Sequence, residues 1–370
     1  MIPITRLALG DEEVAAAARV VRSGWLMNGP QTEEFERLTA QYVGAQHAIA
    51  VSSCTTALHL GLVAAGVGAG DEVICPSFSF IATANAIRLA GATPVFVDID
   101  RHTYNIDPEL IEPAVTQRTK AIMPVSQIGL PADLQAVLDI ATRRGLVVVE
   151  DAAPSLGAEI GGKRLGTISD ITCFSFDARK ILTTGEGGML TTADDKVAAR
   201  LRRLRAHAAS VSTADRDRAN GVILETYDEV GYNYKITDMQ SAIGVVQIRK
   251  IEQIVAERRR LAARYDNLLA DDDRVETPYE PLGYRHVYQS YCVRLRGDRS
   301  QEDIMSAMMA QGVATRRIFS IHHQPAYASL VTPELPETDE AAARTMLLPL
   351  FAGLTDEEQD AVVTALRQCL

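Results

Sequence analysis

The chain has few of the features that mark secreted, membrane or nucleic-acid-binding proteins. Its 370 residues include only five cysteines, an odd number scattered without metal-type spacing, which favours a reducing compartment and buried thiols. The 37 basic residues are outnumbered by 48 acidic ones, and the net charge of −11 argues against a dedicated nucleic-acid binder. No apolar run approaches membrane-spanning length, and the first ten residues lack the regions of a signal peptide. We therefore expect a cytoplasmic protein that binds neither membrane nor nucleic acid.

The chain does contain a regular alternation of short apolar strands and helical segments. Two amphipathic helices are expected first, from about Asp11 to Gly24 and from Pro30 to Gly44. The elements expected next are strands at 48–53, 72–77, 94–99, 121–126 and 146–151, with helices at 55–66, from near Phe80, and at 131–144. This alternation is typical of an α/β fold in which helices sandwich a mainly parallel sheet.

The regular alternation of strands and helices ends in the second half of the chain. The elements expected there are strands at 171–176 and 187–192, a polar surface excursion from Ala208 to Asn220, and a long helix from Thr237 to Leu269. We assign residues 1–245 to a large domain and residues 246–370 to a smaller α+β C-terminal domain. About the first ten residues are expected to pack on the small domain.

Polar residues gather at the carboxyl ends of the predicted strands, where open α/β sheets bind ligands. Strand 48–53 runs into Ser-Ser-Cys-Thr-Thr at a helix start, which suits a phosphate, although taken by itself this segment favours a plain helix cap by Ser53 or Thr55. Strand 146–151 ends in Asp151, an acid that is costly to bury without a partner. Lys180 follows the next strand and precedes glycines that let the backbone fold closely over a ligand.

These parts match the requirements of pyridoxal 5′-phosphate (PLP) chemistry. That chemistry uses a lysine amine, an acid at the pyridine nitrogen and an anchor for the phosphate. Taken singly, Lys180 could be an ordinary solvated lysine. A nicotinamide dehydrogenase is not favoured, because the spaced glycines at 66–72 precede a strand instead of following one.

Several long motifs occur together in one order, and through them the chain resembles the DegT/DnrJ/EryC1/StrS family of sugar aminotransferases. These are fold-type I PLP enzymes of the aspartate aminotransferase superfamily. The similarity extends from residues 24–36 to residues 347–358. Its most specific segments are residues 76–87, 91–100, 148–158, 175–190 and 231–244.

The resemblance implies a role for each residue around the cofactor ring. Lys180 would form the Schiff base with PLP and then move the proton between the substrate carbon and the cofactor. Asp151 would bond the pyridine nitrogen. Phe80 would stack on the ring, although a plain core phenylalanine is a competing interpretation of that position.

For the phosphate, the resemblance implies contacts from Cys54, Thr55 and Ser175. Asn233 would reach the phosphate from the neighbouring subunit, so the protein should be a homodimer with shared active sites. The substrate-side segments contain residues that could equally be structural, namely Trp25, Asn28, Arg316, His322 and Tyr327. No metal is expected, because His322 and His323 have no Cys or acidic partner at matching spacing.

Some positions around the expected site depart from the family pattern: Pro154, Ser126, Cys54, Asp177 and Lys235. Pro154 cannot give the ring the hydrogen bond that the common Gln or His supplies. Ser126 takes the place of a frequent histidine, and Cys54 takes that of the phosphate-loop glycine. Because Lys180 and Asp151 are intact, these departures bear on the substrate.

The expected reaction moves an amino group from L-glutamate or L-glutamine to a keto-sugar, first of all a nucleoside-diphosphate-linked keto-deoxysugar. Arg316 is the first candidate to hold the phosphates. Alternative acceptors are a keto-cyclitol or another carbocyclic or nucleoside-type ketone. Sugar dehydration is a further alternative, but deoxygenating relatives carry histidine at the position of Lys180. Intact Lys180 and Asp151 also argue against a non-catalytic role.

Overall fold

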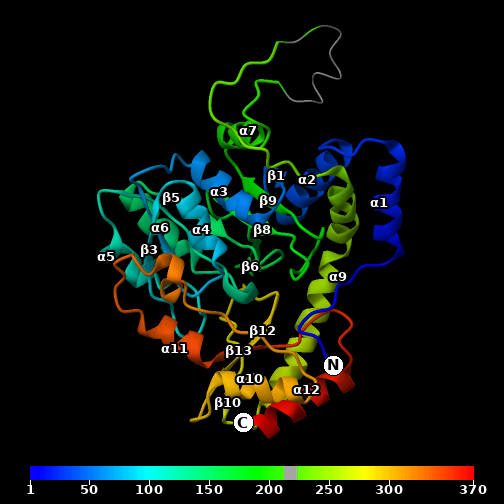
Figure 1. Ribbon diagram of the computed structural model, residues 1–370, viewed down its shortest axis with the longest axis vertical. Coiled ribbons are helices and arrows are strands. Elements are labelled where there is room, and N and C mark those ends of the chain that lie inside the picture. Colours follow the sequence, from blue (N-terminus) through cyan, green and yellow to red (C-terminus); the bar gives the residue numbers. More distant parts are fainter. Residues whose placement is uncertain (212–221, 223) are drawn as a thin grey trace.

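A seven-stranded sheet forms the centre of the computed structural model, which describes residues 1–211, 222 and 224–370 (Figure 1). The strands are β1 (His47–Val51), β2 (Glu72–Pro76), β3 (Thr93–Val97), β4 (Thr119–Ile122), β5 (Val147–Asp151), β8 (Ile171–Ser175) and β9 (Gly188–Thr192). Their order is β1-β9-β8-β5-β4-β2-β3, and every neighbouring pair is parallel except the two pairs that β9 makes. The expected mainly parallel α/β sheet is confirmed.

Helices cover both faces of this sheet because its strands are apolar on both sides. In β1, Ile49 and Val51 belong to one hydrophobic cluster, whereas Ala48 and Ala50 belong to another on the opposite face. The first cluster is closed by α3 (Cys54–Ala64), α4 (Ala82–Leu89) and α7 (Asp195–Leu204). The opposite face is closed by α2 (Pro30–Val43), α5 (Ile111–Ala114), α6 (Leu134–Arg144) and α9 (Asp238–Leu269), and α1 (Asp11–Ser23) packs on α9.

Helix α9 joins the sheet to the C-terminal part of the chain (Figure 1). It begins at a capping box formed by Thr237 and Gln240. Val255 still packs in the core of the large sheet, whereas Leu261 lies in a separate C-terminal core. The elements of that C-terminal part are β10 (Val275–Glu276), β12 (Tyr291–Leu295), β13 (Thr345–Leu348), α10 (Gln301–Ala310), α11 (Pro336–Arg344) and α12 (Asp356–Cys369).

The first residues of the chain lie against this C-terminal part. Ile2 bridges to Val313, and Arg6 pairs with Glu358 of α12 at 3.1 Å. The remaining short elements are strands β6 (Glu159–Ile160), β7 (Lys163–Arg164) and β11 (Tyr284–Arg285), and 3₁₀ turns η1 (Pro108–Leu110), η2 (Gln127–Gly129), η3 (Ile321–His323) and η4 (Pro325–Tyr327).

Several element boundaries differ from the sequence prediction, most of them by one to three residues. Strand β4 ends at Ile122 instead of residue 126, because Pro124 has no N–H to continue the ladder. The helix expected from near Phe80 begins at Ala82. Most of the predicted excursion from Ala208 to Asn220 lies outside the described residues. Of the helices described, none is long and apolar enough to cross a membrane.

Candidate active site

A cavity of about 410 Å³ lies at the carboxyl ends of the parallel strands. Residues that follow β1, β2 and β8 line one side of it, together with Asp151 at the end of β5. The C-terminal part lines the other side through residues around Arg316 and Leu347. Lys180, Asp151, Phe80, Cys54, Thr55 and Ser175 all line this one cavity. The structure therefore brings together the expected cofactor residues of the chain, Asn233 excepted.

Asp151 is fixed in the floor of the cavity. Its side chain is buried, Oδ2 accepts a hydrogen bond from Thr83 Oγ1 at 2.8 Å, and Oδ1 accepts one from the backbone N–H of Ala153 at 3.1 Å. Burial raises the pKa of Asp151 above its ordinary value, although these two hydrogen bonds and the nearby charge of Lys180 act in the opposite direction. A buried acid of this kind favours a cationic or N–H partner.

Lys180 lies in the segment that joins β8 to β9. Its backbone N–H donates to Asp177 O at 3.0 Å, which holds the turn. Within the described residues, Nζ has no hydrogen-bond or ion-pair partner, and the partly buried side chain lines the cavity. An amine in this setting is free to react with a bound carbonyl group.

The segment around Lys180 comes close to the start of α3 at Gly188. A Cβ added at Gly188 would lie 2.4 Å from Ser53 O and 2.8 Å from Cys54 N, so no larger residue fits without moving the backbone. Gly188 thus permits a close approach between two segments of the chain itself, and the predicted folding of the glycine segment over a ligand stays a prediction. The contact places the start of α3 beside the lysine segment.

The start of α3 offers free hydrogen-bond donors. Ser53 caps the helix by accepting from Thr56 N at 3.2 Å. The N–H groups of Cys54 and Thr55 have no acceptor in the described part of the chain, and both residues line the cavity with Ser175. The Cys54 thiol lies in the core, 4.0 Å from Cys173 O, and burial raises its pKa. The backbone of Cys54, and not its thiol, is thus the group available to an anion.

Phe80 is 60% exposed and lines the cavity. The competing interpretation of Phe80 as a core residue is therefore wrong, because the core position is taken by Phe78, which is fully buried. An exposed ring at the cavity wall is available to a flat ligand. Pro154 lines the cavity as well, so its departure from the family pattern bears on whatever binds there.

Arg317 lines the C-terminal side of the cavity as well as the predicted Arg316. Arg316 is held by a backbone bridge to Leu347 of β13. The sequence reasoning missed Arg317 and also Thr83, which positions Asp151. Two features of the sequence could have pointed to these residues. Arg317 is adjacent to the predicted Arg316, and Thr83 lies within the family-specific segment of residues 76–87.

The other predicted contacts do not line this cavity of the single chain: Asn233, Trp25, Asn28, His322 and Tyr327. Tyr327 is a core residue, whose hydroxyl donates to Asn85 Oδ1 at 2.6 Å and whose ring packs edge-on against Phe96. Asn233 is exposed, and its Oδ1 accepts from Lys235 Nζ at 2.7 Å. Trp25 is 39% exposed, and Asn28 is partly buried.

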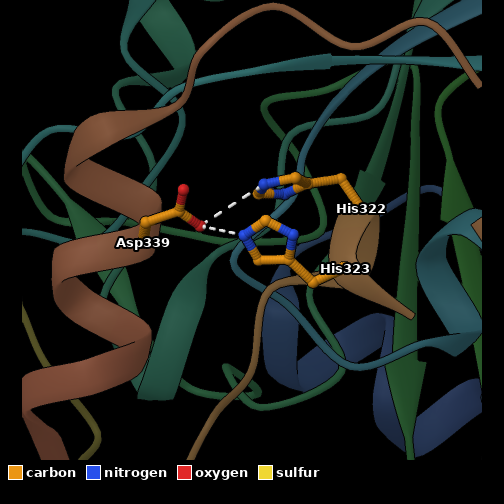
Figure 2. A group of neighbouring side chains, drawn as sticks. All are labelled: His322, His323 and Asp339. Atoms are coloured by element: carbon orange, nitrogen blue, oxygen red, sulfur yellow. Dashed lines mark ion pairs between the residues drawn. The ribbon is translucent and has the colours of Figure 1, made fainter. Parts of the chain in front are cut away.

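The prediction of no metal at His322 and His323 rested on spacing along the chain, and the structure brings an acidic partner to both imidazoles. Helix α11 brings Asp339 to both imidazoles (Figure 2), with Oδ1 at 3.3 Å from His322 Nε2 and 2.9 Å from His323 Nε2. Asp339 is remote from both histidines along the chain, so local spacing could not reveal the contact.

Glu150, beside Asp151 on β5, is a second buried acid near the site. It accepts hydrogen bonds from the hydroxyls of Ser126, Ser169 and Thr172 at 2.7, 3.1 and 3.1 Å. Complete burial raises its pKa from 4.5 to about 7, against the effect of these hydrogen bonds. Ser126, which departs from the family pattern, therefore donates a hydrogen bond to Glu150.

This raised pKa predicts a pH-dependent effect of Glu150→Gln on stability. Because the folded chain binds the proton more tightly than the unfolded chain, the contribution of Glu150 to the free energy of unfolding is largest below pH 4.5 and falls up to about pH 7. Glutamine does not titrate. The variant should therefore gain on the order of 3 kcal/mol relative to the native chain over this range. Urea unfolding of both proteins at the two ends of the range measures the difference, and a constant difference would contradict the shift.

Three comparisons with known proteins agree. The sequence profile of the DegT/DnrJ/EryC1/StrS aminotransferase family matches residues 8–367. A GDP-perosamine synthase of Caulobacter vibrioides is 42% identical over 341 residues, which are 91% of this chain and 89% of the relative.

Two solved structures show the same fold with related chemistry. The sugar aminotransferase Spr1654 of Streptococcus pneumoniae, described as putative and solved in its PLP form, is 28% identical with a TM-score of 0.91 over 100% of this chain and 99% of its own. DesI, solved in the presence of its TDP-sugar product, is 31% identical with a TM-score of 0.90 over 100% of this chain and 92% of its own.

Proposed function

Because the chain belongs to the DegT/DnrJ/EryC1/StrS aminotransferase family of PLP-dependent sugar aminotransferases, we propose that it transfers an amino group from L-glutamate or L-glutamine to a nucleoside-diphosphate-linked keto-sugar. The observation that carries this proposal is the single cavity lined by Lys180, Asp151, Phe80 and the start of α3. The relatives that make GDP-perosamine and a TDP-sugar support the class of acceptor.

The residues present fit PLP. The unbonded N–H groups of Cys54 and Thr55 suit its phosphate, and the buried carboxyl of Asp151 suits a protonated ring nitrogen. The exposed ring of Phe80 suits stacking on a planar heterocycle. When bound, PLP supplies the electron sink and holds the amino group between the two half-reactions.

The proposed roles of the side chains follow from these positions. Lys180 Nζ would hold the cofactor through its aldehyde group and would carry the proton at the substrate carbon. Asp151 keeps the ring nitrogen protonated, and Thr83 and the Ala153 N–H hold its carboxyl in place. Ser175 contacts the phosphate. Arg316 and Arg317 hold the anionic part of the donor or of the nucleotide.

A keto-cyclitol or another carbocyclic ketone is the second candidate acceptor. Two arginines line the cavity together with Lys180, which favours a substrate with a phosphate or carboxylate over a neutral ring. Trp25, Asn28 and His322 stay predicted substrate contacts outside this cavity of the single chain.

The test follows the visible absorbance of the purified PLP-loaded protein. Adding L-glutamate or L-glutamine should remove the PLP band, and adding GDP- or TDP-linked keto-sugars afterwards should restore it. A band that responds to a donor but to no nucleotide-linked ketone would move the proposal to the carbocyclic acceptors. A PLP absorbance band that does not change with either amino acid would contradict the proposed donors.

We also propose a homodimer in which Asn233 contacts the phosphate in the partner's site. Asn233 is exposed and does not line the cavity of its own chain, which is compatible with a contact across subunits. Asn233→Ala should then weaken PLP binding about tenfold or more, since a hydrogen bond to a charged group contributes about 1.5–3 kcal/mol. Equilibrium dialysis of PLP measures this affinity.

Subunit mixing distinguishes a shared site from a self-contained one. A hybrid dimer of Asn233→Ala and Lys180→Ala chains contains one intact site only if the two residues act across subunits. At a PLP concentration that loads the native site but not the Asn233→Ala site, equal mixing and reassembly should then give about a quarter of native activity, because half of the dimers are hybrids with one working site. No recovery, in a mixture shown to contain hybrids, would contradict the shared site.

A further inference from the structure

Outside the proposed active site, the described residues contain one group of side chains with the ligand types of a metal centre: His322, His323 and Asp339. The two histidines come from turn η3, and Asp339 comes from the first half of α11 (Figure 2). All three ligand atoms lie within 4.8 Å of one another. Both imidazole Nε2 atoms face the same carboxylate oxygen.

The distances fit the geometry of a small divalent ion. With metal–ligand bonds of about 2.0–2.1 Å, two ligands of a tetrahedral site lie roughly 3.3 Å apart. The distances from Asp339 Oδ1 to the two nitrogens are 3.3 and 2.9 Å. The two contacts of Asp339 therefore match this spacing, and the two imidazole ligand atoms lie within 4.8 Å of each other.

The neighbouring hydrogen bonds orient the ligands as in known metal sites. His322 Nδ1 lies 2.7 Å from Ser77 Oγ, so an Nδ1–H donated to Ser77 leaves Nε2 free for a metal. Ser320 Oγ donates to Asp339 Oδ1 at 3.2 Å. Asp98 also fixes the start of α11 by accepting from the N–H groups of Glu337 and Thr338.

The exposure of the three side chains permits an ion to reach the site. His322 is 9% exposed, whereas His323 and Asp339 are 63% and 44% exposed. Solvent can therefore supply the fourth ligand. Two imidazoles and one carboxylate are a ligand set typical of zinc and of neighbouring transition metals, and not of calcium or magnesium.

We propose that His322, His323 and Asp339 bind a divalent transition-metal ion of the zinc type, which fastens turn η3 to helix α11. The turn is already tied to the active-site side of the sheet, because Ile321 N donates to Ser77 O and Ser320 bridges to Phe78. The ion would attach the segment from Arg316 to His323 to helix α11 as well. This site positions the arginine-bearing wall of the cavity and takes no part in the proton transfers.

The test is direct metal binding to the full chain loaded with PLP. After treatment with EDTA and dialysis, the protein is titrated with ZnCl₂ by calorimetry, and retained zinc is counted by elemental analysis after gel filtration. We expect one ion per chain, with affinity at least about tenfold lower in His323→Gln and in Asp339→Asn. Circular dichroism verifies that both variants are folded.

The matched control is His47→Gln. His47 Nε2 lies 2.7 Å from Asp195 Oδ1, so this residue forms a histidine–aspartate contact without a second histidine. Its variant should bind zinc as the native chain does. The proposal is overturned if the native chain retains no zinc, or if both His323→Gln and Asp339→Asn bind zinc with native affinity. Neither outcome bears on the aminotransferase proposal, which the absorbance test decides.

Discussion

Lys180→Ala is expected to reduce turnover by at least ~10³-fold, within the range that a positioned acid–base group contributes. The variant removes the amine proposed to bond the cofactor and to move the proton at the substrate carbon. Its fold should stay near native, because in the described part of the chain Nζ makes no hydrogen bond or ion pair. The measurements are steady-state turnover, the PLP absorbance band and thermal unfolding.

Lys196→Ala is the matched control for this substitution. Lys196 lies on α7, remote from the cavity lining, and only its backbone N–H takes part in the helix cap. Turnover in the control should equal that of the native protein. Substantial turnover in a correctly folded Lys180→Ala variant would remove the central assignment of the site.

Asp151→Asn should have the second-largest effect. Asparagine Oδ1 can still accept from the Ala153 N–H, and its amide NH2 can donate to Thr83 Oγ1, which can turn its own proton to Ser79 Oγ, so the local structure should be kept. Asparagine carries no charge to keep a pyridine nitrogen protonated, and the loss of a charged hydrogen bond costs about 1.5–3 kcal/mol. We expect PLP affinity about 10- to 100-fold lower. Turnover should fall by at least ~10²-fold.

Glu150→Gln provides the comparison for Asp151→Asn. The two acids are adjacent on β5, and Glu150 is enclosed by three hydroxyl donors and does not line the cavity. PLP affinity, measured by absorbance titration, should fall only in the Asp151 variant. Equal losses in both variants would mean that the effect comes from disturbing β5 and not from a contact with the ring nitrogen.

Strand positions and the cofactor side of the cavity were predictable because they depend on local patterns. A buried parallel strand such as Val147–Asp151 is apolar along its length, and its last residue is placed at the ligand-binding edge by the topology. The antiparallel direction of β9 was harder to predict. The sequence of an apolar strand does not indicate whether the strand runs parallel or antiparallel to its neighbours.

Contacts that depend on distant segments were not predictable. Tyr327 belongs to a segment with substrate-side residues in the family, yet its hydroxyl is bonded to Asn85 in the core. Asp339 reaches His323 only because α11 folds back over turn η3. Both cases require the packing of whole elements, which the order of residues along the chain does not specify.

The place of β1 at the edge of the sheet has a consequence for how the molecule is made. Within the described residues, β1 is joined to the sheet through β9 alone, with Ile49 opposite Leu190, so half of the chain must be synthesised before β1 can pair. Pairings between such distant segments are slow to form. The start of α3, where we propose that the phosphate binds, touches β9 at Gly188 and is therefore completed late. A nascent chain should acquire affinity for PLP only after β9 has left the ribosome, however early its other strands assemble.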